Sequence, residues 1–121
     1  MSLESEYTTM VLRKKKSGHA INDALTPRQA TALHMAVGVS GEAGELLDAI
    51  KKWAIYQKPL DRANVVEELG DIEFFLEGLR QDLDIAREDT LQFNMAKLEK
   101  RYRGEYTDAE AAARADKEQE A

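Results

Sequence analysis

The sequence contains no cysteine, only two prolines and seven glycines, and no hydrophobic run long enough to cross a membrane. Without cysteine there can be no disulfide, no thiolate nucleophile and no zinc site with cysteine ligands, which is compatible with a reducing cytoplasm. So few prolines and glycines argue against a turn-rich β-sandwich or a collagen-like repeat. The first ten residues are acidic and polar, so we expect no signal peptide and a cytoplasmic protein.

A length of 121 residues is enough for one domain with its own core. Hydrophobic residues make up 43% and charged residues 33%, which is typical of a soluble globular protein and not of a disordered chain. The formal net charge of −6 argues against sequence-independent binding to DNA or RNA, so we expect neither nucleic acid nor a membrane as a partner. A polyanionic substrate would need metal cations between it and the protein.

The chain has a helical pattern throughout, with no period-two alternation and no hairpin signal. Thr26, Pro27 and Gln29 form a capping box with a proline at the first helical position. From Val65 to Leu83, apolar residues recur at spacings of three and four, which is typical of a helix-bundle seam. We therefore expect an all-α protein. The predicted helices cover residues 3–16, 26–57, 61–83 and 84–104.

Glycines interrupt the middle of the second predicted helix. Gly38, Gly41 and Gly44 each cost about 0.5–1 kcal/mol relative to alanine in a helix interior. Their spacing of three puts them on neighbouring positions of one side, where another helix or a ligand can approach closely. A kink or break near Ser40 is the alternative interpretation.

The last residues differ in composition from the rest of the chain. Residues 105–121 are rich in alanine and charge and nearly lack large apolar side chains, so they cannot bury much surface. We expect one helical domain over residues 1–104 and a peripheral or disordered polar extension over residues 105–121.

Two acidic motifs carry the strongest chemical signal. Glu42 and Glu45 form a Glu-x-x-Glu pair, and Glu68 and Asp71 form a Glu-x-x-Asp pair on the next predicted helix. A spacing of three puts both side chains of a pair on one helix face. Antiparallel packing of the two helices would direct both pairs into the same space. Oxygen ligands alone favour hard cations, so the pattern predicts a site for Mg²⁺ or Mn²⁺.

Two other interpretations compete with a magnesium site. In a chain with 33% charged residues, the four acids can be ordinary solvated side chains. A di-iron bundle would need two Glu-x-x-His pairs. The pairs here are Glu-Glu and Glu-Asp, and the only histidines are His19 and His34. The sequence therefore disfavours iron and leaves solvated charges as the alternative.

A third group of polar residues lies on the last predicted helix. Asn94, Lys97 and Arg101 are spaced by three and four, which puts them on one face. An amide, an ammonium and a guanidinium together suit phosphate or sugar oxygens. A solvated basic face is the alternative interpretation.

Taken in order, the three motifs resemble those of the MazG-like nucleoside triphosphate pyrophosphohydrolases. The resemblance spans roughly residues 26–106. It implies an all-α, four-helix-bundle-like fold of the dimeric dUTPase type, assembled as a homodimer or homotetramer. One departure is Gly41, where many relatives carry a further acidic residue. The matching segments are residues 41–46, 67–72 and 94–102.

The resemblance also implies an activity. The expected reaction is Mg²⁺-dependent cleavage between the α- and β-phosphates of a nucleoside triphosphate, giving a monophosphate and pyrophosphate, with removal of unwanted nucleotides as its role. Water activation is left open between Glu45 as general base and a metal-bound hydroxide. The matching metal ligands are Glu42, Glu45, Glu68 and Asp71. The matching positions that face the nucleotide or its phosphates are Asn94, Lys97, Arg101 and Tyr102.

Two further residues are weaker candidates for substrate contact. His34 lies eight residues before Glu42, on broadly the same helix side, and could touch the base or the sugar. Lys51 could reach the phosphates. For both residues, a structural or solvated side chain is the alternative. The competing function for the whole chain is a non-catalytic helical bundle that binds a nucleotide or a protein partner.

Overall fold

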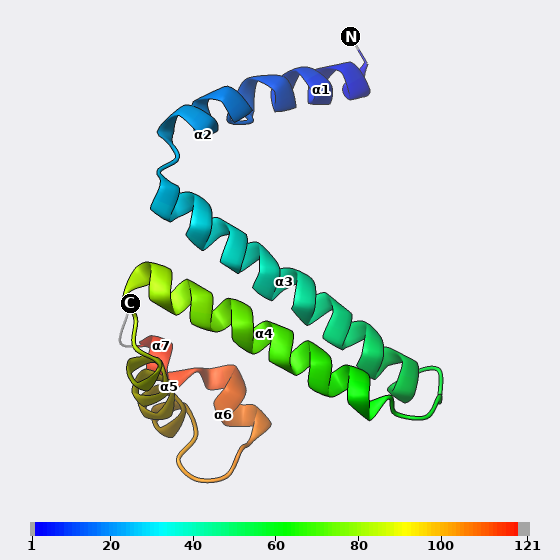
Figure 1. The fold of residues 1–121 in the computed structure, drawn as a ribbon, viewed down its shortest axis with the longest axis vertical. Helices are drawn as coiled ribbons and strands as arrows, with labels where there is room; N and C mark the ends of the chain where they lie inside the picture. The colour runs from blue at the N-terminus through cyan, green and yellow to red at the C-terminus, as the bar shows by residue number, and fades with distance from the viewer. Residues whose placement is uncertain (1, 119–121) are drawn as a thin grey trace.

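The computed structural model describes residues 2–118, and within them every regular element is a helix, so the predicted all-α class is confirmed. A search of these residues finds no helix with the length and apolar character that a membrane span requires. Figure 1 shows the arrangement of the helices. They are α1 (Leu3–Lys14), α2 (Gly18–Ala24), α3 (Pro27–Ala54), α4 (Arg62–Leu83), α5 (Arg87–Arg101), α6 (Asp108–Ala113) and α7 (Ala115–Glu118).

Helices α3 and α4 form a long antiparallel hairpin at the centre of the fold (Figure 1). The predicted capping box is present: the Gln29 amide nitrogen donates to the Thr26 hydroxyl, and the Gln29 side chain accepts from the Thr26 amide. At the other end of the hairpin the loop is short, and Gln57 turns it with a left-handed backbone (φ 54°). A short loop leaves antiparallel packing as the available geometry.

One stripe of each helix makes the α3–α4 seam. The half-buried and buried residues recur at spacings of three and four, which is the period of one helix face. On α3 they include Met35, Gly38, Val39, Glu42, Leu46 and Ala49. On α4 they include Val65, Glu68, Ile72, Phe75, Leu76 and Leu79. Acidic residues therefore stand inside an otherwise apolar seam.

Of the three glycines predicted to allow a close approach, only Gly38 does so among residues 2–118. A Cβ atom at Gly38 would overlap the ring of Phe75 on α4, whereas a Cβ at Gly41 or Gly44 would meet nothing within 4 Å. The alternative of a break near Ser40 is wrong, because α3 continues without interruption from Pro27 to Ala54.

The predicted helix ends differ from the observed ones in several places. Helices α1, α3 and α5 end two or three residues earlier than predicted, at Lys14, Ala54 and Arg101. Residues 18–24 form α2, which the sequence pattern did not predict; the Ser17 hydroxyl caps its first turn. The sequence predicts that the last long helix covers residues 84–104, with Asp84 at its start. Asp84 instead ends α4 with a left-handed backbone (φ 54°), and α5 begins after Ala86 without a side-chain cap. Aspartate tolerates the left-handed region better than most residues, which accounts for this use.

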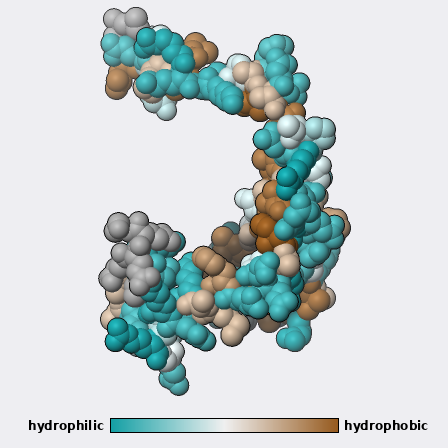
Figure 2. Space-filling view, turned by 90° about the vertical axis from the view of Figure 1, so that its left-hand side faces the viewer, coloured by the Kyte–Doolittle hydropathy of each residue, from teal (hydrophilic) through white to brown (hydrophobic). Residues whose placement is uncertain are grey.

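Much apolar surface stays open to water. Ala49, still 9% exposed, is the most buried hydrophobic residue among those described, and Figure 2 shows apolar side chains at the surface along the middle of the molecule. Leu47 and Phe74, on α3 and α4, are 68% and 65% exposed. A surface with this many exposed large apolar residues is typical of an interaction site.

The C-terminal helices pack against α5 and not against the hairpin. The substantial helix contacts in residues 2–118 are those of α3 with α4, α5 with α6, and α5 with α7. Figure 1 shows α5 beyond the C-terminal end of α4, with α6 and α7 beside it. The arm formed by α1 and α2 extends away from the hairpin at the opposite end of the figure.

The seam predicts opposite effects for two glycine substitutions. Gly38→Ala should lower the free energy of unfolding by about 1–3 kcal/mol, because the added methyl group displaces the Phe75 ring. Gly70→Ala on α4, which meets open space, should raise it by about 0.5–1 kcal/mol through helix propensity. Urea denaturation followed by circular dichroism measures both. Equal effects of the two substitutions would contradict the close contact at Gly38.

Candidate metal centre

The candidate site lies in the α3–α4 seam, about halfway along the hairpin. Glu42 occupies the position on α3 between Val39 and Leu46, and it faces α4 because those neighbours do. Glu68 takes the corresponding position on α4. It is only 6% exposed, which is rare for a glutamate unless the charge is neutralised or paired. The helices that bury the apolar residues therefore bury these carboxylates as well.

Three of the four predicted acids meet in space. Glu42, Glu68 and Asp71 each place one carboxylate oxygen within 4.8 Å of the others. Glu68 is buried, and the other two are half-buried. The fourth acid, Glu45, is exposed one turn further along α3, close enough for its charge to act on Glu68. The Glu-x-x-Asp motif thus brings both of its side chains into the cluster, whereas the Glu-x-x-Glu motif brings Glu42 alone.

Two oxygens of the cluster are buried without a hydrogen-bond partner among the described residues: Oε2 of Glu42 and Oε2 of Glu68. A buried acceptor with no donor costs free energy, and a buried carboxylate costs more. No lysine or arginine side chain forms an ion pair with either residue in the structure described here. A cation in the cluster would satisfy both oxygens.

The cluster also changes the protonation of its most buried member. The nearby carboxyl group of Glu42, burial, and the charge of Glu45 raise the pKa of Glu68 from 4.5 to about 7. Protonation of Glu68 reduces the repulsion between the clustered carboxyl groups. A divalent cation would replace that proton with a larger positive charge.

The donor set fits Mg²⁺ or Mn²⁺. All the converging atoms are carboxylate oxygens, which hard cations prefer, and they come from two rigid helices. The spread of up to 4.8 Å between oxygens is larger than an octahedral Mg²⁺ shell requires, so modest side-chain rotation would accompany binding. Glu42, Glu68 and Asp71 would hold the ion, and Glu45 stands at the edge of the same site.

The candidate phosphate-binding residues lie on another helix. Asn94 is exposed, Lys97 is half-buried, and Arg101 and Tyr102 lie at the end of α5. Helix α5 packs on α6 and α7 and has no substantial contact with α3 in the described chain. A single copy of residues 2–118 therefore does not bring this group to the carboxylate cluster.

The two weaker candidates have partners of their own. The His34 ring packs edge-on against Phe75, with 6.4 Å between the ring centroids, on the α3 face that continues toward Glu42. Lys51 has an ion pair with Asp48 at 3.6 Å and lies over the Tyr56 ring, 5.5 Å from its centroid. Neither residue belongs to the carboxylate cluster.

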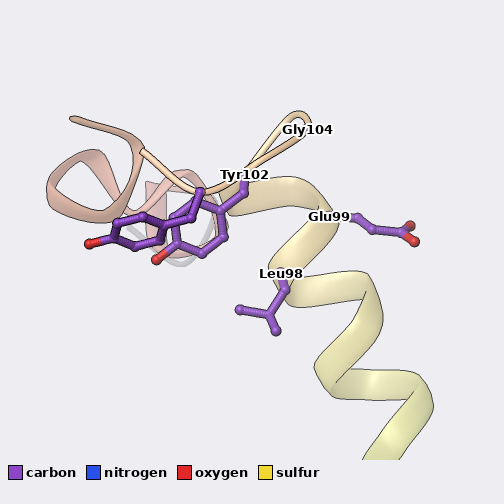
Figure 3. Close-up of a pocket in the computed structure, with 5 residues that line it drawn as sticks. Leu98, Glu99, Tyr102 and Gly104 are labelled. Atoms are coloured by element: carbon purple, nitrogen blue, oxygen red, sulfur yellow. The ribbon is translucent and has the colours of Figure 1, made fainter. Parts of the chain in front are cut away.

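The sequence did not predict two residues that contact the candidate phosphate-binding residues of α5. Asp116 of α7 accepts hydrogen bonds from the Arg101 guanidinium. Tyr106 packs on Tyr102, with ring centroids 5.1 Å apart, beside a shallow hollow of about 240 Å³. In Figure 3, Leu98 and Tyr102 extend toward this hollow while the Glu99 carboxylate points away. The alanine-rich tail has no periodicity that would have predicted either contact.

The fold and the cluster define an all-α protein with a candidate site for a hard divalent cation. Comparison with known families adds that residues 30–104 match the MazG nucleotide pyrophosphohydrolase domain. The matched range holds both acidic motifs and nearly all of α3, α4 and α5. The chain belongs to the MazG family, as the motifs predicted. Searches of curated proteins and of solved structures found no match.

The raised pKa of Glu68 predicts how the metal-free protein responds to pH. Between about pH 4.5 and 7 the folded state binds more protons at this carboxyl than the unfolded state does, so this group lowers the free energy of unfolding as pH rises. Denaturation experiments in EDTA should therefore show that the free energy of unfolding decreases more from pH 5 to pH 8 for the native sequence than for Glu68→Gln, whose side chain cannot ionise. An equal decrease in both proteins would contradict the raised pKa of Glu68.

Proposed function

We propose that this protein is a Mg²⁺-dependent nucleoside triphosphate pyrophosphohydrolase that cleaves the α–β phosphoanhydride bond. The observation that carries the proposal is the group of three carboxylates, two of them with an oxygen left without a partner, inside the α3–α4 seam. Membership of the MazG family supplies the reaction class. Release of a monophosphate and pyrophosphate would remove unwanted nucleotides from the cellular pool.

The roles of the side chains follow from their burial. Glu42, Glu68 and Asp71 would hold the cation, and the apolar seam around Glu68 limits the access of water to its inner side. A cation held there would supply charge neutralisation for the phosphates and would lower the pKa of a coordinated water. Glu45 is exposed next to the cluster, where it can accept a proton from the attacking water. Attack in line at the α-phosphorus then expels pyrophosphate.

We assign phosphate and nucleotide contacts to Asn94, Lys97, Arg101 and Tyr102 of α5. An amide and two cations on one helix face match the charge and geometry of a polyphosphate. Because α5 does not pack on α3 within one chain, a second copy has to bring this face to the cluster. The complete site is therefore proposed to form in a homodimer or homotetramer.

The surface proposed for that assembly is an exposed apolar stripe of α3, on a different side from the stripe that packs against α4. Leu33, Val37 and Leu47 lie at helical spacing away from α4 and are 54–68% exposed. Gly41 and Gly44 lie between them with open space where a Cβ would be. Glycines flanked by exposed apolar side chains would allow a helix of another copy to approach closely.

Hydrolysis should depend on the carboxylate cluster and on Mg²⁺. With a panel of nucleoside triphosphates and Mg²⁺, we expect monophosphate and pyrophosphate in equal amounts, and no turnover in EDTA. Glu42→Gln and Asp71→Asn should each reduce kcat by about 10²-fold or more, because loss of a ligand weakens the charge stabilisation of the transition state. Chromatography of the products measures the rates.

Glu73→Gln is the matched control, since Glu73 is an exposed carboxylate on α4 outside the cluster. It should keep full activity. Binding of a nucleotide in calorimetry without any product would instead favour the non-catalytic binding module, for which the glycine at position 41 is the supporting observation.

The exposed stripe predicts the assembly state. Light scattering should give the mass of two or four chains. Leu47→Gln should raise the dissociation constant about tenfold, because an amide replaces apolar surface that a partner would cover. Leu3→Gln, on the distant arm, gives the same chemical change at a residue that is 82% exposed and should have no effect. A single-chain mass at every concentration would contradict the shared site.

A further inference from the structure

The C-terminal helix α7 holds a carboxylate directly against α5. The Arg101 guanidinium donates from Nε to Asp116 Oδ1 at 2.9 Å and from Nη2 to Asp116 Oδ2 at 3.2 Å. The two side chains are only 16% and 8% exposed, whereas both partners of the Lys52–Asp48 ion pair on α3 are about half exposed. A two-point, nearly dry ion pair is stronger than an ordinary surface pair.

The same carboxylate also lies within the field of a second cation of α5. The hydrogen bond from Arg101 lowers the pKa of Asp116 below its usual value, and the charge of Lys97 adds to this effect. The hydrogen bond to Asp116 in turn raises the pKa of Arg101. The pair is therefore fully charged at neutral pH. One tail carboxylate thus acts on both of the cations that we assign to phosphate binding.

Asp116 contacts Arg101 with the geometry that a bound phosphate would have. Asp116 uses the Nε–Nη2 edge of the guanidinium, which is the edge that pairs two oxygens of a carboxylate or of a phosphate. Two anions cannot use this edge at once. A phosphate can reach it only if Asp116 leaves.

The segment that carries Asp116 is short. Helix α7 has four residues, and it follows Arg114, whose backbone is left-handed (φ 49°). Helix α6, just before it, is anchored separately: Thr107 caps its first turn, and Glu110 accepts a hydrogen bond from the Arg103 amide at 2.9 Å. Departure of α7 would therefore leave α6 in place.

We propose that α7 is an intramolecular competitor of the substrate, in which Asp116 occupies Arg101 until the triphosphate displaces it. The inference rests on the proposed function, because it assigns Arg101 to the phosphates. In this arrangement only chains with α7 undocked bind substrate with full affinity. If α7 is docked about nine-tenths of the time, the apparent affinity falls about tenfold.

A positioning role for Asp116 makes the opposite prediction. If the carboxylate serves to orient Arg101 toward the substrate, removing its charge must weaken binding or turnover. If the pair is only structural, removing it changes stability and leaves substrate binding alone. The sign of the change in affinity therefore separates the three roles.

The test compares Asp116→Asn with Asp108→Asn in the full-length chain. Both substitutions remove one negative charge from the tail. Asp108 accepts a hydrogen bond from the Tyr106 hydroxyl and does not touch Arg101, so it controls for the general change in charge. We expect Asp116→Asn to lower the KM for the nucleoside triphosphate about five- to tenfold with kcat nearly unchanged, and Asp108→Asn to change neither. Asp116→Ala serves as a second variant with the same expectation.

Calorimetry with inorganic tripolyphosphate and Mg²⁺ gives a readout that does not require turnover. Asp116→Asn should bind it about five- to tenfold more tightly than the native sequence does. A higher KM, a lower kcat, or the same affinity as in Asp108→Asn would overturn the proposal. Absence of hydrolysis by the native sequence would refute the proposed activity, while the tripolyphosphate comparison would still decide the role of Asp116.

Discussion

The seam between α3 and α4 places carboxylates that repel one another among the apolar residues that hold the two helices together. Glu42 and Glu68 occupy positions where the neighbouring turns carry Val39, Leu46 and Ile72. The apolar residues hold the helices together, and this packing forces the acids into contact. Stability and cation binding are opposed here, because apolar residues at the two acidic positions would strengthen the seam and remove the ligands. Such a conflict is expected at a functional site and is hard to explain elsewhere.

Local features of the fold could be read from the sequence because they depend on neighbouring residues. The capping box at Thr26 and Gln29 is complete within four residues, and the motif spacing places Glu68 and Asp71 on one face in any helix. The sequence could not show in this way which side of α3 faces α4. Met35 and Val39 lie toward α4 while Leu33 and Val37 stay exposed, although both pairs have the same helical spacing. Only the partner helix decides between two equivalent stripes.

Contacts between residues far apart in the sequence could not be predicted, for the same reason. Arg101 and Asp116 are fifteen residues apart, and the tail between them is too polar to show which face it presents. Asp84 illustrates a different ambiguity, since aspartate suits both a helix N-cap and a left-handed helix end. The candidate site was accordingly predictable as two motifs, while the environment of its α5 group required three-dimensional information.

The left-handed residue Arg114 has a mechanical consequence for the helix that follows it. An L-amino acid in this region costs about 1–2 kcal/mol relative to a right-handed backbone. Arg114 is also the C-cap of α6, and its amide donates to the Glu110 carbonyl. One residue therefore both ends α6 and sets the direction in which α7 leaves it, so a substitution at Arg114 would reach the ion pair at Asp116 through the backbone alone.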